Sequence, residues 1–142
     1  MEKTTLHPVD GRGFARAVSI SEPTHERVFV SGAIAADEEY NLIGEDDMEA
    51  QTRYVYGQLE SYLDELGGSM DDVVRIRVYV TTMDETAMAG YREGRAEFYD
   101  APEHYPSSTL VEVESLVLEG AMVEVDAEAI IPNDGWEATT AP

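Results

Sequence analysis

The chain has 142 residues and no cysteine, so disulfides, thiolate metal sites and a cysteine nucleophile are excluded. Its 30 acidic residues outnumber nine lysines and arginines, and the net charge of −21 repels nucleic acid and anionic membranes at ordinary ionic strength. Such spread-out acidity indicates a halophilic protein, and with no apolar run near ~18 residues we expect it to be cytoplasmic, without a membrane partner. A nucleic-acid partner is disfavoured, although molar salt weakens the repulsion.

Two strands open the predicted fold. Residues 1–13 lack a regular apolar pattern and are predicted to be a loop. Residues 14–20 alternate loosely between apolar and polar side chains, and residues 27–34 form a strong strand pattern. Because the segment between them, SEPTHE, is rich in turn formers, the two runs predict an antiparallel pair.

A helix is predicted over residues 48–66, where apolar side chains recur at intervals of three and four residues. Asp46 or Asp47 can cap its start, and a pair of glycines ends it. Gly57 lies inside the helix, where glycine costs up to ~1 kcal/mol relative to alanine. Its presence there predicts close packing against the sheet.

Residues 71–82 show the clearest strand pattern in the chain. One face is predicted to carry Val74, Ile76, Val78 and Val80, and the other Arg75, Arg77 and Tyr79. Asp84 is a candidate cap for a second helix that extends to about Tyr99, where the segment DAPEHYP ends it.

Two further strands are predicted at residues 108–116 and 122–131. The tail, residues 132–142, is predicted to be irregular, with Trp136 as a candidate anchor on a neighbouring surface. Three scattered histidines show no spacing typical of a metal site, so no metal is expected.

These elements predict a single α+β domain over residues 1–142, with a core from about 14 to 131. The order ββαβαββ indicates a sandwich in which two helices cover one face of a mixed sheet. The other face needs a cover if it is apolar. Copies of the same chain would supply it most simply, so a closed homo-oligomer is expected.

Five segments of the chain are informative as a set: VFVSGAI, DDVVRIRVYVTTMDE, AEFYD, YPSSTLVEV and VEVDAEAI. Together they resemble the YjgF/RidA family of reactive-intermediate deaminases, also called the L-PSP family, and the resemblance spans roughly residues 14–131. It implies a chorismate-mutase-like fold and a homotrimer with three clefts between subunits. It also implies a hydrolase that converts enamines and imines, such as 2-aminoacrylate, to keto acids and ammonia without a cofactor. Other members are described as ribonucleases or translation inhibitors.

The family's motifs fall on the sequence with several departures. The pattern P-A-R-S-x-V-E-V lies over residues 106–113, so Ser108 occupies the place of the arginine that grips the substrate carboxylate. Glu124 matches the glutamate of the catalytic cleft, whereas Phe14 replaces a tyrosine and lacks its hydroxyl. By this resemblance the candidate ligand-binding residues are Ser107, Ser108, Thr109, Phe14, Ser31, Gly32 and Arg92, of which Arg92 lies over an asparagine of the second helix.

Each candidate residue also has a structural interpretation. Glu124 is one of many acidic residues on strands, and the three hydroxyls at residues 107–109 can satisfy local backbone groups. Arg92 either grips a carboxylate from the opposite wall or pairs with Glu85, Glu93 or Glu97 along its helix.

Because Ser108 replaces the arginine, a carboxylate would receive a neutral hydrogen bond in place of two charge-assisted ones. Neutral hydrogen bonds are about half as strong, so 2-aminoacrylate is a poor candidate substrate. Three hypotheses remain open. The chain hydrolyses another small enamine or imine with Glu124 as the catalytic residue, or it is a trimer that binds a small ligand without chemistry, or it is a ribonuclease. Its charge opposes the ribonuclease.

Overall fold

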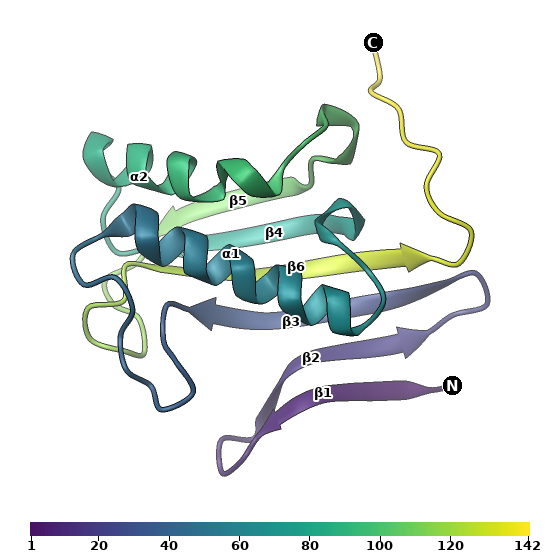
Figure 1. Cartoon of the computed structure of the whole chain (residues 1–142), viewed down its shortest axis with the longest axis horizontal. Coiled ribbons are helices and arrows are strands. Elements are labelled where there is room, and N and C mark those ends of the chain that lie inside the picture. The colour runs from purple at the N-terminus through teal and green to yellow at the C-terminus, as the bar shows by residue number, and fades with distance from the viewer.

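The computed structural model describes all 142 residues and shows one six-stranded sheet with two helices packed on one of its faces (Figure 1). The strands are β1 (Lys3–Val9), β2 (Phe14–Ser21), β3 (His25–Ile34), β4 (Val73–Val80), β5 (Ser107–Glu112) and β6 (Val123–Pro132). The helices are α1 (Met48–Glu65) and α2 (Glu85–Arg95), with short 3-10 turns at Met70–Asp72, Ala96–Phe98 and Pro102–His104. The predicted α+β class, with both helices on one face of a mixed sheet, is confirmed.

The strand order across the sheet is β1-β2-β3-β6-β4-β5. Strands β1, β2 and β3 form an antiparallel meander, and β6 lies antiparallel between β3 and β4. Strand β5 runs parallel to β4, because α2 carries the chain back across the helix-covered face. The predicted order ββαβαββ is confirmed, and one additional strand, β1, comes before it in the chain.

That additional strand, β1, corrects the prediction of a loop at the N-terminus. Lys3–Val9 pairs with β2 along the edge of the sheet. Most of its side chains are exposed, so its sequence lacks the apolar alternation that reveals a half-buried strand. A contact with α1 fixes its far end, where the His7 ring nitrogen Nε2 lies 2.9 Å from both carboxylate oxygens of Glu65.

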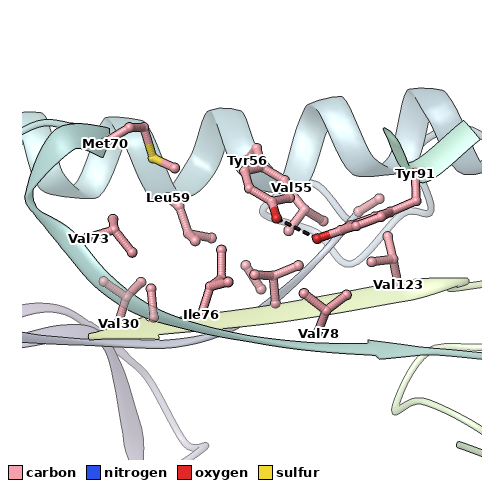
Figure 2. Close-up of a cluster of buried hydrophobic side chains, with 14 of the residues drawn as sticks. Val30, Val55, Tyr56, Leu59, Met70, Val73, Ile76, Val78, Tyr91 and Val123 are labelled. Atoms are coloured by element: carbon pink, nitrogen blue, oxygen red, sulfur yellow. Dashed lines mark hydrogen bonds between the residues drawn. The ribbon is translucent and has the colours of Figure 1, made fainter. Parts of the chain in front are cut away.

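The core lies between the two helices and the central strands (Figure 2). The apolar stripe of α1 places Val55, Leu59 and Leu63 against the sheet, where they are completely buried. From the sheet, β4 and β6 contribute Ile76, Val78, Val80, Val123 and Val125. The hydroxyls of Tyr56 and Tyr91 form a polar pair in this layer, 2.6 Å apart.

A bulge at the start of β4 overturns part of the predicted facing of that strand. Its pairing with β6 shifts between Val73 and Arg75, so the alternation restarts one residue later. Val73 is consequently buried, with 2% of its surface exposed, whereas Val74 is 36% exposed. The prediction that Val74 shares a face with Ile76, Val78 and Val80 was therefore wrong, whereas the latter three do share one buried face.

Both helices begin at the predicted caps. The side chain of Asp47 accepts a hydrogen bond from the Ala50 backbone N–H, and Asp84 accepts one from Ala87. The second helix ends at Arg95, four residues before its predicted end, and a 3-10 turn follows it.

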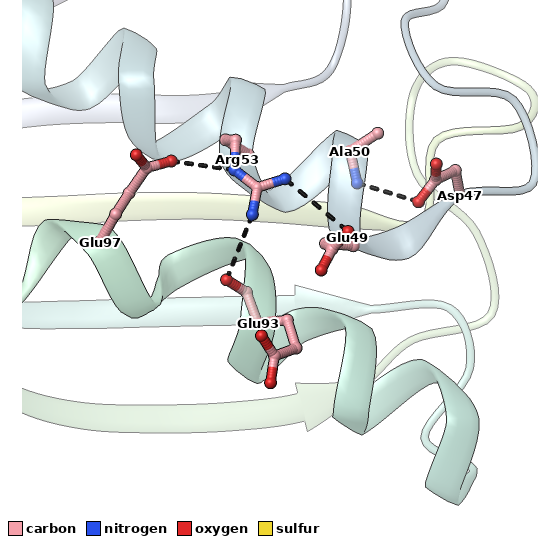
Figure 3. Close-up of polar contacts among 6 residues, drawn as sticks. All are labelled: Asp47, Glu49, Ala50, Arg53, Glu93 and Glu97. Carbon is pink, nitrogen blue, oxygen red and sulfur yellow. Dashed lines mark hydrogen bonds and ion pairs between the residues drawn. The ribbon is translucent and has the colours of Figure 1, made fainter.

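The two helices are joined by an arginine and by a close backbone approach. Arg53 of α1 pairs with Glu97 at 2.9 Å and with Glu49 at 3.8 Å (Figure 3). A Cβ atom at Gly94 would lie 2.6 Å from the Glu49 carbonyl oxygen. Close packing was predicted at Gly57, but a Cβ there meets no atom within 4 Å, so that prediction was wrong.

Candidate functional site

Glu124 lies on the face of the sheet that the helices leave uncovered. Its neighbours on β6, Val123 and Val125, are buried in the core, so strand alternation turns Glu124 the other way. Tyr79 of β4 is its partner in the sheet, and Val111 of β5 continues the same row. We call this surface the open face of the sheet.

The carboxylate of Glu124 is packed closely against β3. A Cβ atom at Gly32 would come within 2.6 Å of one of its oxygens, so only glycine leaves room for the carboxylate in this position. The preceding residue, Ser31, donates its hydroxyl to the Ala15 carbonyl of β2 and thereby ties β3 to its neighbour. The structure thus brings Glu124 and Gly32 into contact, while the Ser31 hydroxyl is engaged with the backbone.

Burial raises the pKa of Glu124 above its ordinary value, and the negative charge of Asp126 two residues along the strand raises it further. A carboxyl group with a raised pKa exchanges protons closer to neutral pH, which suits general acid–base chemistry.

The three hydroxyls of the segment 107–109 do not share one face. Ser108 pairs with Ile76 of β4 and turns with it toward the helices, whereas Ser107 and Thr109 turn toward the open face. Ser107 donates its hydroxyl to the Val74 carbonyl at 3.0 Å, so it satisfies a local backbone group. Within one chain, therefore, Ser108 and Glu124 lie on opposite faces of the sheet.

Phe14 does not meet either residue within one chain. It begins β2, two strands away from β6, and 39% of its surface is exposed. The guanidinium of Arg16 lies 5.6 Å from its ring centre. Phe14 borders a separate hollow beside the β1–β2 turn, together with Lys3 and Thr5.

Arg92 is exposed on α2, and none of its proposed acidic partners forms an ion pair with it; Glu97 pairs with Arg53 instead. On α2, the arginine that faces a cavity is Arg95, one helical turn later.

The cavity lies between α2 and β5 and has a volume of about 450 Å³. Arg95 and Ser108 line it, and the remaining lining residues are Tyr56, Tyr91, Tyr99, Tyr105, Ile76, Pro106 and Leu110. We call it the tyrosine cavity. The guanidinium carbon of Arg95 lies 5.5 Å from the ring centre of Tyr91 and 5.7 Å from that of Tyr99. Both distances are within the range of a cation–π contact.

Burial raises the pKa of Tyr91 to about 12, and it also raises the pKa values of Tyr56 and Tyr99, so these three hydroxyls are neutral at physiological pH. Arg95 is the only aspartate, glutamate, histidine, lysine or arginine among the lining residues. The family motifs drew attention to Arg92, but Tyr91, Arg95 and Tyr99 recur every four residues, and that spacing could have indicated Arg95.

No group of three histidine, aspartate or glutamate side chains is arranged to hold a metal ion. Neither helix is both long and apolar enough to cross a membrane.

Comparisons with known proteins agree on one family. The model of the family described as endoribonuclease L-PSP matches residues 10–131. A RutC family protein of Pyrococcus abyssi is 31% identical over 102 residues, which cover 72% of this chain and 76% of the relative.

Two solved structures are similar in fold. A member of the YjgF family from Mycobacterium tuberculosis is 29% identical with a TM-score of 0.71, and the match covers 92% of this chain and all of the other. RidA from an Antarctic Psychrobacter is 24% identical with a TM-score of 0.69, covering 89% of this chain and 94% of the other.

Proposed function

Because the chain belongs to the YjgF/RidA family, whose L-PSP model spans residues 10–131, we propose that it hydrolyses the enamine or imine of a small metabolite in clefts between the subunits of a homotrimer. The observation that carries this proposal is Glu124, a half-buried carboxyl group with a raised pKa that is packed against Gly32. Glu124 accepts a proton from water as the water oxygen bonds to the imine carbon, and the return of this proton to nitrogen gives a carbinolamine. A second proton then passes from the carbinolamine hydroxyl to nitrogen, so the C–N bond breaks, ammonia leaves and the C=O bond forms.

The placement of the candidate residues supports a cleft built from two subunits. Ser108 faces the helices from the edge strand β5, and Glu124 faces the other way from β6. One chain cannot present both to the same small molecule. A second copy docked on the open face would bring its β5 edge toward the first copy's Glu124, and a ring of three copies closes this arrangement.

The substrate that we propose is not 2-aminoacrylate. Ser108 stands where the family pattern has its carboxylate-gripping arginine, and a hydroxyl supplies one neutral hydrogen bond in place of a bidentate, charge-assisted pair.

A trimer that binds a small ligand without chemistry is the second candidate. The presence of Ser108 at the place of the family's arginine favours it. If the loss of the arginine removed catalysis, the cleft would still hold a ligand through Thr109, Phe14 and backbone groups. Ligand-induced melting shifts without product release would identify this function.

Imine hydrolysis in high salt tests the proposal. An amino-acid oxidase supplies 2-imino acids, and the release of ammonia above the spontaneous rate is measured. We expect wild-type turnover with bulkier imino acids, and a loss of about 10²-fold or more in Glu124→Gln with folding intact. Ser108→Arg should gain activity on 2-aminoacrylate.

Several results would overturn parts of the proposal. Activity that survives in Glu124→Gln contradicts the role of Glu124, and no turnover in either wild type or Ser108→Arg favours the binding trimer. Ribonuclease activity that persists through repurification, and equally in Glu124→Gln, would instead support the endoribonuclease that the family description names.

A further inference from the structure

The tyrosine cavity differs in charge from the rest of the molecular surface. The chain carries 30 aspartates and glutamates, yet none of them lines this cavity. Each of four other hollows includes at least one acidic side chain: Glu38, Asp47, Asp10 and Asp64 are examples. The one charged group in the tyrosine cavity is positive, so the cavity favours an anion inside a strongly negative protein.

Arg95 is held in a way that leaves its hydrogen-bonding edge available. The guanidinium carbon lies over the rings of Tyr91 and Tyr99, and no carboxylate of the chain comes within 4.0 Å of the guanidinium. The side-chain hydrogen bonds of arginines involve only Arg53 and Arg77, so the N–H groups of Arg95 are available for a bidentate pair with a carboxylate. The ring contacts also fix the side chain, which lowers the entropy lost when a ligand binds.

The remaining walls are suited to an aromatic ring. Tyr99 and Tyr105 meet edge to face, with ring centres 5.6 Å apart, and Tyr56 lies 6.0 Å from Tyr99. Such edge-to-face geometry extends readily to a ligand ring, at about 0.5–1.5 kcal/mol per pair. The volume of about 450 Å³ is within the range of small-molecule sites and far exceeds what an acetate or pyruvate would fill.

We propose that the tyrosine cavity binds an aromatic monocarboxylate, with Arg95 gripping the carboxylate from α2, the tyrosine rings enclosing the aromatic group, and Ser108 contacting the ligand at the cavity mouth. The guanidinium absent from β5 is thus supplied by a helix. The tyrosine cavity belongs to the cleft that Ser108 lines, so its ligand class is that of the cleft. Binding of the ligand is independent of the proposed function, and only turnover of the bound molecule rests on it.

Isothermal titration with matched probes tests the inference. Phenylacetate carries the ring and the charge, phenylacetamide carries the ring alone, and acetate carries the charge alone. We expect phenylacetate to bind wild type at least tenfold more tightly than either of the others. Arg95→Gln should lose that preference by at least tenfold, and Arg95→Lys should retain part of it, because lysine keeps the charge without the fork. Arg12→Gln, in the turn between β1 and β2 and outside the cavity, removes the same charge; it is the matched control and should bind as wild type does.

Three results would overturn the inference: no binding of phenylacetate, equal binding of phenylacetamide, or undiminished binding in an Arg95→Gln variant whose melting temperature is unchanged. Imine hydrolysis distinguishes its failure from that of the proposed function. Turnover without phenylacetate binding or inhibition removes the inference alone. Phenylacetate binding that depends on Arg95, without turnover of any imine, removes the proposed function alone.

Discussion

The half-buried carboxyl group of Glu124 costs the folded chain stability at neutral pH. Its native pKa lies above the ordinary value of 4.5 that applies to the unfolded chain. At a pH between the unfolded and the native pKa, the native chain therefore holds a proton that the unfolded chain has released. The free energy of unfolding therefore falls as the pH rises through this window.

The variant Glu124→Gln has no such loss, because glutamine does not ionise. We expect it to be more stable than wild type at pH 7, with the difference disappearing below about pH 4, where both native and unfolded wild type are protonated. Urea unfolding at a series of pH values measures this difference. In an Asp126→Asn background the difference should shrink, since Asp126 is the second cause of the raised pKa. A variant that is less stable than wild type across the whole pH range would contradict the expectation.

A second prediction for individual residues concerns the hydrogen bond between the hydroxyls of Tyr56 and Tyr91. Both side chains are buried, so Tyr56→Phe leaves the Tyr91 hydroxyl without its partner and should cost about 1–3 kcal/mol of unfolding free energy. The double variant with Tyr91→Phe should cost less than the sum of the two single changes, because it removes both ends of the bond. Additive costs, measured by urea unfolding, would show that the bond contributes nothing.

Individual residues were predictable where the backbone alone decides their place. Alternation along β6 was enough to separate Glu124 from the core valines on either side of it. The position of Arg95 depends on how α2 packs over β5, and a motif alignment that pointed to Arg92 could not supply that geometry. The opposite facing of Ser108 and Glu124 likewise follows from strand pairing between distant segments, which the sequence does not state.

At the scale of elements, the contact between α1 and α2 is closest at Gly94. A methyl group at Gly94 would meet the Glu49 carbonyl at 2.6 Å and the Thr52 Cβ at 2.7 Å, so the helices would have to separate. We expect Gly94→Ala to lose about 1–3 kcal/mol of unfolding free energy.

Gly57→Ala is the matched control for this change. It lies inside α1, where an added methyl group would have no atom within 4 Å, so the better helix propensity of alanine should stabilise the chain by about 0.5–1 kcal/mol. Thermal and urea unfolding of both variants measure the pair. Equal effects of the two substitutions would contradict the packing described for Gly94.

Periodicity predicted the elements that bury one face and missed those that do not. Both helices and the central strands are evident from their apolar spacing. Strand β1 stays exposed along the sheet edge, and the bulge at Val73 depends on pairing with β6, so neither leaves a local pattern.

At the scale of the whole molecule, the open face is the surface on which the proposed homotrimer would form. It carries apolar side chains between charged ones: Val18, Ile20, Phe29, Tyr79, Val111 and Ile130. We expect light scattering in molar salt to give three times the 15.7 kDa of one chain. Phe29→Glu should reduce the mass, whereas Met83→Glu, in the turn after β4, should leave it unchanged. A monomer in wild type would contradict the interface cleft.

The net charge of −21 makes stability depend on salt. At low ionic strength the carboxylates repel one another across the fold, and at 1 M salt the screening length shortens to about 3 Å. We expect the melting temperature to rise by several degrees between about 0.1 and 2 M sodium chloride. Sucrose at equal osmolarity, which does not screen charge, should raise it less, and a melting temperature independent of salt would contradict the halophilic interpretation.

The central position of β6 has a consequence for synthesis. Until Pro132 has left the ribosome, the chain can form only two separate pieces of sheet, the meander β1-β2-β3 and the parallel pair β4-β5. Strands β3 and β4 then each present an unpaired edge, the kind of surface on which nascent chains aggregate. Folding of this core is therefore completed only after β6 has been synthesised, and a chain released before residue 123 has no strand with which to join its two halves.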